Sequence, residues 1–346
     1  MSAGSRIRPG LRFHGDQLAA PGTLDFAVNV WPGGRPRRLR RALHRALLSA
    51  SYPDETAAVT ALARRYRRPR AEVLLTNGAG EAFWLLAHAL RPRHAVCVHP
   101  SFTEPEAALR QVGARITRVF RREGDWSLDP TAVPDDAELI VLGNPNNPTG
   151  NVDRPSAIAA LARPGRVLVV DEAFMDFVRR RGSSLAERRD VPGLVVVRSL
   201  TKLWSLAGVR AGFVLAPAEL VATLSENRQP WSVNALACAA LEACANDRVT
   251  QKRVARDVAA ARAELAGRLE ALPGLRVWPS ETNFLLLEVP DGPALTEALR
   301  RDGLVVRPAS SFPGLGPNHL RVAVRLPEEN ARLAVALEAA LRGGLR

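Results

Sequence analysis

The sequence contains very little lysine. Only two of its 48 basic residues are lysines, Lys202 and Lys252, and the rest are arginines. Arginine stays protonated in proteins, whereas a partly buried lysine can lose its proton and attack a carbonyl group. Lys202 lies in RSLTKLWSLAGVR (198–210), directly after a strand-like LVVV run, while Lys252 lies in an ordinary helical pattern. We therefore interpret Lys202 as a covalent catalytic lysine.

Cysteines and long apolar runs are also scarce, and each absence argues against a class of protein. The cysteines Cys97, Cys238 and Cys244 are odd in number, widely spaced and without metal-ligand spacing. We therefore expect reduced thiols in a cytoplasmic protein, and no bound metal. No apolar run reaches the roughly 18 residues that a membrane span needs. No apolar segment follows the charged N-terminus, so we expect neither a membrane protein nor a secreted one.

Nucleotide-binding and nucleic-acid-binding motifs are missing as well. The dinucleotide fingerprint lacks its third glycine, and no P-loop occurs. The net charge of +13 comes partly from arginine runs at 33–45, 64–70 and 179–181. No zinc-finger spacing or aromatic RNA-binding signature accompanies them, so we do not expect nucleic acid as a partner. A positive field that attracts small phosphorylated substrates is the simpler interpretation.

The remaining pattern is an alternation of strands and helices. Apolar, β-branched runs predict strands in the arm and large domain at 24–30, 73–76, 95–98, 115–120, 139–143, 166–171, 194–198 and 212–216. Further strands are predicted at 276–278, 283–289, 304–307 and 319–324. We expect an α/β fold with a large doubly wound, mostly parallel sheet and a small C-terminal α+β domain. The predicted divisions are an N-terminal arm (1–34), a large domain (35–245) and a small domain (246–346).

Polar residues follow several predicted strands at their carboxyl ends, where ligands bind in an open α/β sheet. The first strand of the large domain runs into NGAGE (77–81), whose short residues and following helix N-terminus suit an anion. Asn147 lies in the proline-framed NPNNPTG (144–150), and Asp171 ends a buried strand. An aspartate in that place binds a metal or a positively charged ring. Without a second cluster of metal ligands, the ring is favoured.

These groups together fit pyridoxal 5′-phosphate. A lysine holds its aldehyde as a Schiff base, and an aspartate keeps its pyridine nitrogen protonated so that the ring accepts electrons from a carbanion. An amide donates to its phenolate oxygen. Hydroxyls, a helix N-terminus and an arginine suit its phosphate. Lys202, Asp171 and Asn147 are the candidates for the first three roles.

The ordered set NGAGE, NPNNPTG, DEAF, SLTK and Arg210 resembles the fold-type I pyridoxal-phosphate enzymes of the aminotransferase class I/II superfamily, over essentially the whole chain. Within it, the chain resembles the histidinol-phosphate aminotransferases and, more closely, the L-threonine-O-3-phosphate decarboxylases of cobalamin synthesis with their actinobacterial relatives. The narrower resemblance rests on HGD (14–16), DFAVN (25–29), YPD (52–54), HPSFTEPEAAL (99–109), DEAF, RSLTK, QPWSVNALA (229–237), NFLLL (283–287) and FPGLGPNHLRVAVR (312–325).

The resemblance implies a role for each matching residue. Lys202 is the implied catalytic, Schiff-base residue. The implied cofactor ligands are Ala79, Gly80, Phe102 (stacked on the ring), Asn147, Asp171, Ser199, Thr201, Lys202, Arg210 and, from the neighbouring subunit of a homodimer, Tyr52. The implied ligands of a small anionic amino-acid substrate are His14, Asn29, Arg321 (for its carboxylate) and Arg325.

Three departures from the family pattern bear on the substrate. HGD replaces the decarboxylases' HGGN, and VWPGG (30–34) stands where they have a segment beginning N-P-L-G. Both changes lie in the arm that helps to enclose the substrate, so they leave the substrate's identity open. Phe174 stands where histidinol-phosphate aminotransferases usually have tyrosine, which favours the decarboxylases.

The sequence leaves the reaction open, because the bond that breaks is the one held perpendicular to the cofactor ring. An arginine shifted by about an ångström could change which bond that is. Our first hypothesis is a lyase that decarboxylates L-threonine O-3-phosphate or a similar compound, with Lys202 returning a proton afterwards. The alternatives are a histidinol-phosphate type aminotransferase and a specialised-metabolism enzyme that carries out elimination or carbon–carbon bond formation on a larger anionic substrate. A nucleic-acid-binding protein is the alternative from a different class.

Overall fold

A seven-stranded sheet forms the larger part of the computed structural model, which describes residues 10–343. Its strands are β2 (Val73–Asn77), β3 (His94–His99), β4 (Arg115–Phe120), β5 (Leu139–Gly143), β6 (Val167–Asp171), β7 (Leu194–Ser199) and β8 (Ala211–Leu215). Their order across the sheet is β2-β8-β7-β6-β5-β3-β4. β8 runs antiparallel to both of its neighbours, and the other strands run in a common direction. The sheet is therefore mostly parallel, as expected.

Helices cover both faces of this sheet because successive side chains of a buried strand point to opposite faces. Leu168 and Val170 join a core with α1, α2, α5 and α7, whereas Val169 joins a second core with α3, α4 and α6. The helices are α1 (Arg37–Leu47), α2 (Thr56–Tyr66), α3 (Ala79–Leu90), α4 (Glu104–Gln111), α5 (Pro155–Ala159), α6 (Ala218–Glu226) and α7 (Ala235–Ala245). This is the doubly wound arrangement that the sequence predicts.

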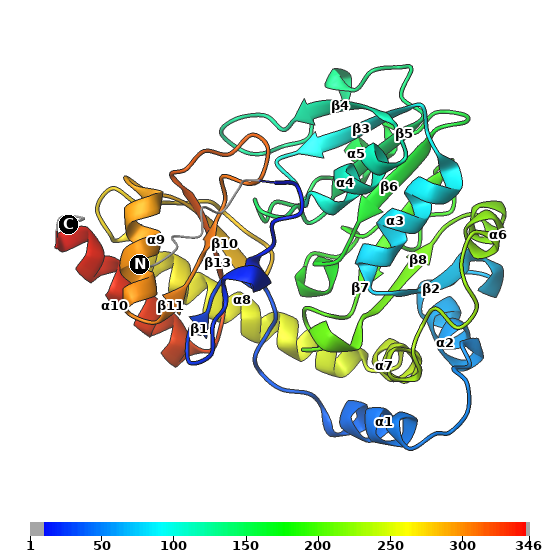
Figure 1. Ribbon diagram of the computed structural model, residues 1–346, viewed down its shortest axis with the longest axis horizontal. Coiled ribbons are helices and arrows are strands. Elements are labelled where there is room, and N and C mark those ends of the chain that lie inside the picture. Colours follow the sequence, from blue (N-terminus) through cyan, green and yellow to red (C-terminus); the bar gives the residue numbers. More distant parts are fainter. Residues whose placement is uncertain (1–9, 344–346) are drawn as a thin grey trace, which may run out of the picture.

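A smaller α+β region follows the long helix α8 (Arg248–Glu270), which runs beneath both regions in Figure 1. Its antiparallel sheet has the order β12-β13-β10-β9. The elements are β9 (Arg276–Val277), β10 (Phe284–Glu288), α9 (Gly292–Arg301), β12 (Arg307–Pro308), β13 (His319–Ala323) and α10 (Pro327–Arg342). Its apolar side chains form a core of their own with α8. The division at residues 245 and 246 stays a prediction.

Two predicted strands are shorter than expected, each for a local reason. The run at 24–30 forms only β1 (Leu24–Asp25), because the Asp25 carboxylate accepts hydrogen bonds from the backbone of Ala27 and Val28 and turns the chain. The run at 304–307 divides into β11 (Leu304–Val305), which pairs with β1, and β12, which pairs with β13. The arm is thus tied to the smaller region through β11.

The arm and the smaller region meet the large sheet at the carboxyl ends of its parallel strands. Arg321 of β13 donates from Nη1 to Oδ1 of Asn147, in the loop after β5, at 2.6 Å, and from Nη2 to the carbonyl of Ala27 in the arm at 2.6 Å. Three separate segments therefore enclose one space at this edge. Between residues 10 and 343, no helix has the length and apolarity to cross a membrane.

Candidate active site

Lys202 and Asp171 lie together at this edge, and burial disfavours the charge on each of them. Burial, helped by the positive charges of Arg321 and Arg210, lowers the pKa of the Lys202 amine to about 8, against the effect of Asp171. Burial raises the pKa of the Asp171 carboxyl to about 6, although the Ala173 N–H donates to it at 2.9 Å. An amine that titrates near neutrality can serve as a nucleophile or carry a proton.

The start of α3 and the ends of β7 and β8 form a cradle suited to an anion. Gly78 precedes α3 with φ of +79°, which favours glycine, and a Cβ there would lie 2.5 Å from Nη2 of Arg210 and displace the guanidinium. Ser199 pairs with Gly212 across β7 and β8, and Gly212 touches the backbone that leads into Ala79. A phosphate in this cradle would meet backbone N–H groups, a helix dipole and a guanidinium.

Hydroxyl groups complete one side of the cradle, where Oγ of Ser199 and Oγ1 of Thr201 are 2.8 Å apart. Gly80, in the first turn of α3, also faces Arg210, since a Cβ on it would lie 3.8 Å from Nη2. The structure therefore brings together the phosphate ligands that the sequence suggested around Arg210. Their role as ligands stays a prediction.

Asn147 has the orientation that an amide donor to a ring oxygen needs. Its Oδ1 accepts the hydrogen bond from Arg321, so its NH₂ group remains available as a donor. Asn29 is buried beside the same arginine. With its amide oxygen turned toward Arg321, it accepts from Nε at 3.2 Å and from Nη1 at 3.1 Å. Arg321 thus fixes two amides and the arm, and no carboxylate among residues 10–343 pairs with it.

Arg307, which the sequence interpretation missed, lies beside Arg321. The two residues are opposite each other on β12 and β13, and both are buried. Nη2 of Arg307 donates to the Phe13 carbonyl at 2.8 Å and to the Ser311 hydroxyl at 2.7 Å, while Nη1 has no hydrogen-bond partner among residues 10–343. A buried, unpartnered guanidinium N–H usually indicates a missing ligand.

Burial lowers the pKa of Arg307 to about 10 and that of Arg321 to about 9, and the Arg307 charge adds to the effect on Arg321. Neither guanidinium has a carboxylate within ion-pair distance in the described part of the chain. Two adjacent buried cations repel each other, and an anion between them would relieve that repulsion. The only sequence signal for Arg307 was an arginine at the end of an apolar strand run, which is a weak one.

The N-terminal arm brings His14 to Phe102. The two rings are 5.6 Å apart, and Phe102 also packs against Phe83. The Glu104 carboxylate accepts from the Trp84 indole at 2.9 Å and pairs with Nε2 of His14 at 2.6 Å. Because the His14 hydrogen bond holds the pKa of Glu104 below its usual range, Glu104 is ionised and Nε2 of His14 is the donor. His14 is therefore fixed in place by the arm's contact with α4.

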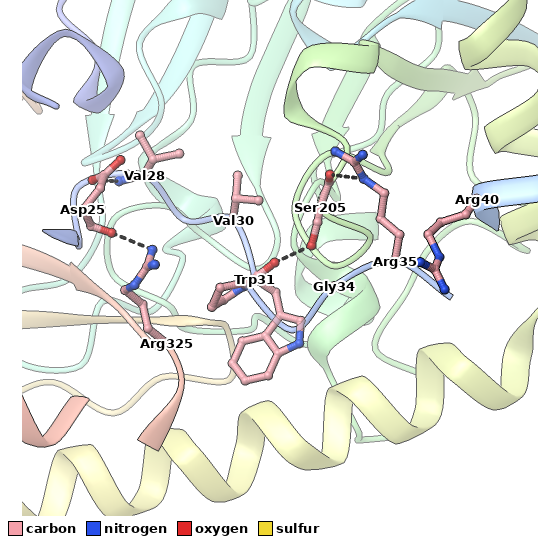
Figure 2. A pocket seen from close by; sticks show the side chains of 10 residues that line it. Asp25, Val28, Val30, Trp31, Gly34, Arg35, Arg40, Ser205 and Arg325 are labelled. Carbon is pink, nitrogen blue, oxygen red and sulfur yellow. Dashed lines mark hydrogen bonds between the residues drawn. The ribbon is translucent and has the colours of Figure 1, made fainter. Parts of the chain in front are cut away.

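Arg325 does not join the Arg307–Arg321 pair. Arg321 lies within β13, whereas Arg325 lies beyond the end of that strand at Ala323. The guanidinium of Arg325 donates to both oxygens of Glu329, at 3.0 and 3.1 Å, and to the Asp25 carbonyl at 2.8 Å. Figure 2 shows Arg325 beside Asp25 in a separate cavity of about 450 Å³, which Trp31, Arg35 and Ser205 also line.

Tyr52 lies on the surface of its own chain. Its side chain is 74% exposed and stacks on Trp231, with ring centroids 4.5 Å apart. Leu47 and Leu48, at the end of α1, are also exposed. Tyr52 can therefore act at a cofactor only by reaching a second subunit, which is the role that the resemblance implies for it.

These residues fit pyridoxal phosphate on three observations of this structure. A lysine amine with a pKa of about 8 lies beside the half-buried carboxyl group of Asp171. A glycine-lined cradle meets the Arg210 guanidinium at the start of α3. The NH₂ group of the Asn147 amide remains available as a hydrogen-bond donor, because the amide oxygen is held by Arg321. Within the described residues these would hold the aldehyde, the pyridine nitrogen, the phosphate and the ring oxygen.

Comparisons with known proteins support this interpretation of the site. A family model described as "Aminotransferase class I and II" matches residues 22–337. The chain is 42% identical over 341 residues to a "Histidinol-phosphate aminotransferase" of Mycobacterium bovis, covering 97% of this chain and 92% of the relative. It is 35% identical over 333 residues to the "Threonine-phosphate decarboxylase" of Salmonella typhimurium, covering 92% of each.

The fold also matches a solved structure. The crystal structure of the histidinol-phosphate aminotransferase from Clostridium acetobutylicum superposes with a TM-score of 0.87 at 23% identity, covering 92% of this chain and 99% of that one. At that identity the likeness concerns the fold alone. It extends over both the large sheet and the smaller α+β region.

Proposed function

We propose a reaction for this chain from the premise that it belongs to the aminotransferase class I and II family. It is accordingly a pyridoxal-phosphate-dependent enzyme with the fold-type I architecture of that family. Within the family, we propose that it is a lyase that removes the carboxylate of a phosphorylated amino acid such as L-threonine O-3-phosphate. Relatives with both decarboxylase and aminotransferase names are consistent with this premise.

The observation that carries the proposal is the pair of adjacent buried arginines. Arg307 and Arg321 offer two guanidiniums, without carboxylate partners in the described chain, to a single ligand. An amino acid with a phosphate on its side chain carries two anionic groups a few bonds apart. Charge-assisted hydrogen bonds from guanidinium to carboxylate and phosphate are the strong ones in proteins. The pair therefore suits a substrate with both groups.

The roles of the residues follow from their positions. Pyridoxal phosphate, when bound, supplies an electron sink for the pair left on the substrate α-carbon. Arg321, held by Asn147 and the arm, would orient the carboxylate, and Arg307 with His14 would bind the phosphate. The Lys202 amine, which titrates near pH 8, would deliver a proton to that carbon once carbon dioxide has left.

The first test measures carbon dioxide. The purified holoenzyme is given L-threonine O-3-phosphate with no keto acid present, and we expect carbon dioxide and the corresponding amine phosphate in equal amounts. Unphosphorylated L-threonine should be a poorer substrate. In Arg307→Gln the preference for the phosphorylated compound should shrink by about tenfold or more, because a charge-assisted contact is lost. If wild type releases no carbon dioxide, the lyase proposal fails.

Transamination is the second candidate, and the 42% identical relative named histidinol-phosphate aminotransferase favours it. Histidinol phosphate carries a phosphate but no carboxylate, so it would need only one of the two arginines. The keto acid that accepts its amino group has two carboxylates and would need both. Glutamate formation from histidinol phosphate and 2-oxoglutarate measures this activity directly. Product that depends on the keto acid, with no carbon dioxide, would assign the chain to the aminotransferases.

We also propose that the enzyme is a homodimer in which Tyr52 completes the neighbouring site. The exposed apolar residues Leu47, Leu48, Tyr52 and Trp231 suit a surface that another copy covers. Sedimentation should give twice the chain mass. Subunits carrying Tyr52→Ala and subunits carrying Lys202→Ala should regain activity when mixed, because one site of the hybrid has neither change. A monomeric active enzyme would contradict the proposal.

A further inference from the structure

A groove lined with cations lies away from the Lys202 site. Its cavity of about 830 Å³ lies between α8 and the loop that follows the short helix η4 (Met175–Phe177). Arg248, Lys252 and Arg256 line it from α8, and residues 179–181, all arginines, line it from the loop. We call this cavity the basic groove. It contains the second of the chain's two lysines.

The basic groove is separated from the Lys202 site by the alternation of the strands. Glu172 directly follows Asp171, and Arg198 directly precedes Ser199, so these neighbours point to opposite sides of the backbone. Arg198 lines the groove and lies over the ring of Tyr66. Tyr66 is the last residue of α2 and belongs to the core that α2 shares with α7. The groove is therefore a different space from the cradle around Arg210.

Most cations of the groove have no acidic partner. Within residues 10–343, Arg179, Arg181 and Lys252 form no ion pair or hydrogen bond, and Arg248 donates only to the Arg65 carbonyl at 2.9 Å. Two acidic residues line the groove: Asp176 is held by Arg198 and Gln251, and Glu187 pairs with Arg67 at 3.8 Å. Positive charge therefore dominates the open part of the groove.

Some exposed arginines elsewhere on the chain are paired with acidic residues, whereas those of α1, such as Arg37 and Arg41, line a shallow hollow on one helix without ion pairs in the described part of the chain. Arg268 pairs with Glu264 at 2.7 Å, Arg300 pairs with Glu297 at 2.8 Å, and Arg342 pairs with Glu338. An arginine-rich composition alone explains such paired surfaces. The groove differs because each of its two facing walls holds two cations without an acidic partner among residues 10–343, although Arg180 pairs with Glu281 and Arg256 with Asp257, both at 3.5 Å.

We propose that the basic groove binds a small molecule that carries a chain of phosphates. Residues at i, i+4 and i+8 of a helix form a row with about 5–6 Å between neighbours, which suits successive phosphate groups. Phosphates held by this row would also reach the arginines of the opposite wall. The cavity volume lies in the range of small-molecule sites, about 300–1,000 Å³.

The apolar side chains in the groove suit an organic group attached to the phosphates. Met175, Val178 and Ala255 line the cavity beside the Tyr66 ring. An inorganic oligophosphate would use only the cations, whereas a nucleoside oligophosphate would also cover these side chains. Both share the chemistry that the groove recognises. A bound ligand would join α8 to the loop at 179–181.

Lys252 provides a probe that needs no mutation. Because the chain has two lysines and the cofactor occupies Lys202, an amine-reactive reagent applied to the holoenzyme should label only Lys252 and the N-terminal amine. Tripolyphosphate should slow labelling of Lys252 by about fivefold or more at saturation, and leave the N-terminal amine unchanged. ATP forms the second arm. Equal protection by both indicates recognition of the phosphate chain, and stronger protection by ATP adds the apolar contact; either result supports the proposal.

Two charge-matched triple variants separate a built site from net charge. Arg179→Gln, Arg181→Gln and Lys252→Gln remove three unpaired groove cations, while Arg268→Gln, Arg300→Gln and Arg342→Gln remove three paired ones. Calorimetry on the cofactor-saturated protein should show tripolyphosphate binding weaker by about tenfold or more in the first variant, since charge-assisted contacts to the phosphates are lost. The second variant should bind within about twofold of wild type.

Four results would overturn the proposal. They are an absence of binding by wild type at millimolar tripolyphosphate, equal weakening in both variants, binding that leaves Lys252 unprotected, and binding that excess pyridoxal phosphate abolishes. The last would place the anion in the Arg210 cradle. Protection of Lys252 by single-stranded RNA but not by tripolyphosphate would assign the groove to nucleic acid instead.

Discussion

In two clusters of charged side chains at the large sheet, burial and hydrogen bonding act on the pKa of a carboxyl group with opposite outcomes. Around Glu106, near β3, the carboxylate accepts from His99 at 2.7 Å, from Arg110 at 2.7 Å and from Arg118 at 2.8 Å. These hydrogen bonds outweigh burial and hold the pKa of Glu106 far below its usual range. Around Lys202, burial outweighs all partners and raises the pKa of Asp171 to about 6.

The difference separates a structural cluster from a site that awaits a ligand. In the Glu106 cluster every charge has a partner within the chain, so the folded state favours ionisation. Cys97, His99 and Glu106 also offer ligand atoms within 4.8 Å of one another, but the two guanidiniums already neutralise the carboxylate that a metal ion would need. In the Lys202 cluster the charges lack partners that a bound cofactor and substrate would supply.

The largest effect should come from Lys202. In cofactor-loaded Lys202→Ala we expect kcat to fall by about 10³-fold or more, because the group that anchors the cofactor and moves the proton is gone. Steady-state assays and the visible absorption of the bound cofactor measure this. The matched control is Lys252→Ala, which removes the other lysine and should keep kcat. Residual activity above about a tenth of wild type would contradict the assignment.

Glu106→Gln should give the next largest effect, and on stability. Removing one partner of a buried ion-pair network costs about 3 kcal/mol in the free energy of unfolding. The pKa of Glu106 is depressed in the folded state. Its contribution to the free energy of unfolding is therefore present above pH 4.5, the ordinary pKa of the group, and is lost as the pH falls below that value. Urea unfolding at neutral pH should show the loss, and kcat should change little. A loss of activity without a loss of stability would contradict the structural role.

Most of the fold follows from local sequence patterns, because the strands that carry it are short apolar runs. The predicted strand at 139–143 agrees with β5 to the residue, and those at 166–171 and 194–198 differ from β6 and β7 by one residue. The prediction failed at 24–30, where the side chain of Asp25 bonds to the backbone and ends β1. Such a turn depends on a rotamer, which periodicity does not contain.

The placement of Asp171 and Lys202 at the sheet edge was predictable because Asp171 ends β6 and Lys202 lies three residues after the end of β7, while their roles stay predictions. Arg307 was missed because its partnership with Arg321 depends on pairing between β12 and β13, fourteen residues apart. Glu104 was missed because its contact with His14 joins segments ninety residues apart. Pairings of this kind are set by the tertiary fold, and no local pattern in one sequence encodes them.

Asp171→Asn should stabilise the cofactor-free protein, with a pH dependence opposite to that of Glu106→Gln. Because burial raises the folded-state pKa from 3.8 to about 6, the folded chain disfavours the carboxylate, and this cost grows as the pH rises from about 4 to 6. Above pH 6 the variant should be more stable by about 3 kcal/mol, since each unit of pKa shift corresponds to about 1.4 kcal/mol, and below pH 4 it should equal wild type. Its kcat should nevertheless fall, since the cofactor's pyridine nitrogen would lose its acidic partner.

Urea titrations of both cofactor-free proteins at several pH values measure the difference. A variant that is less stable than wild type at neutral pH would show that the Asp171 charge is already satisfied within the chain. Asp171 would then resemble Glu106, whose charge is satisfied by partners within the chain.

The smallest effect should come from Arg325, four residues after Arg321. Its guanidinium is held by both oxygens of Glu329, whereas the partners of Arg321 in the described part of the chain are neutral. A partly exposed ion pair contributes about 0–1 kcal/mol, so Arg325→Gln should lower stability only slightly and change kcat/KM by less than about threefold. Arg321→Gln should raise KM for the anionic substrate by about tenfold or more, because an unpaired charge is the one available to a ligand. Equal effects of the two substitutions on KM would show that pairing within the chain does not distinguish the arginines that bind substrate.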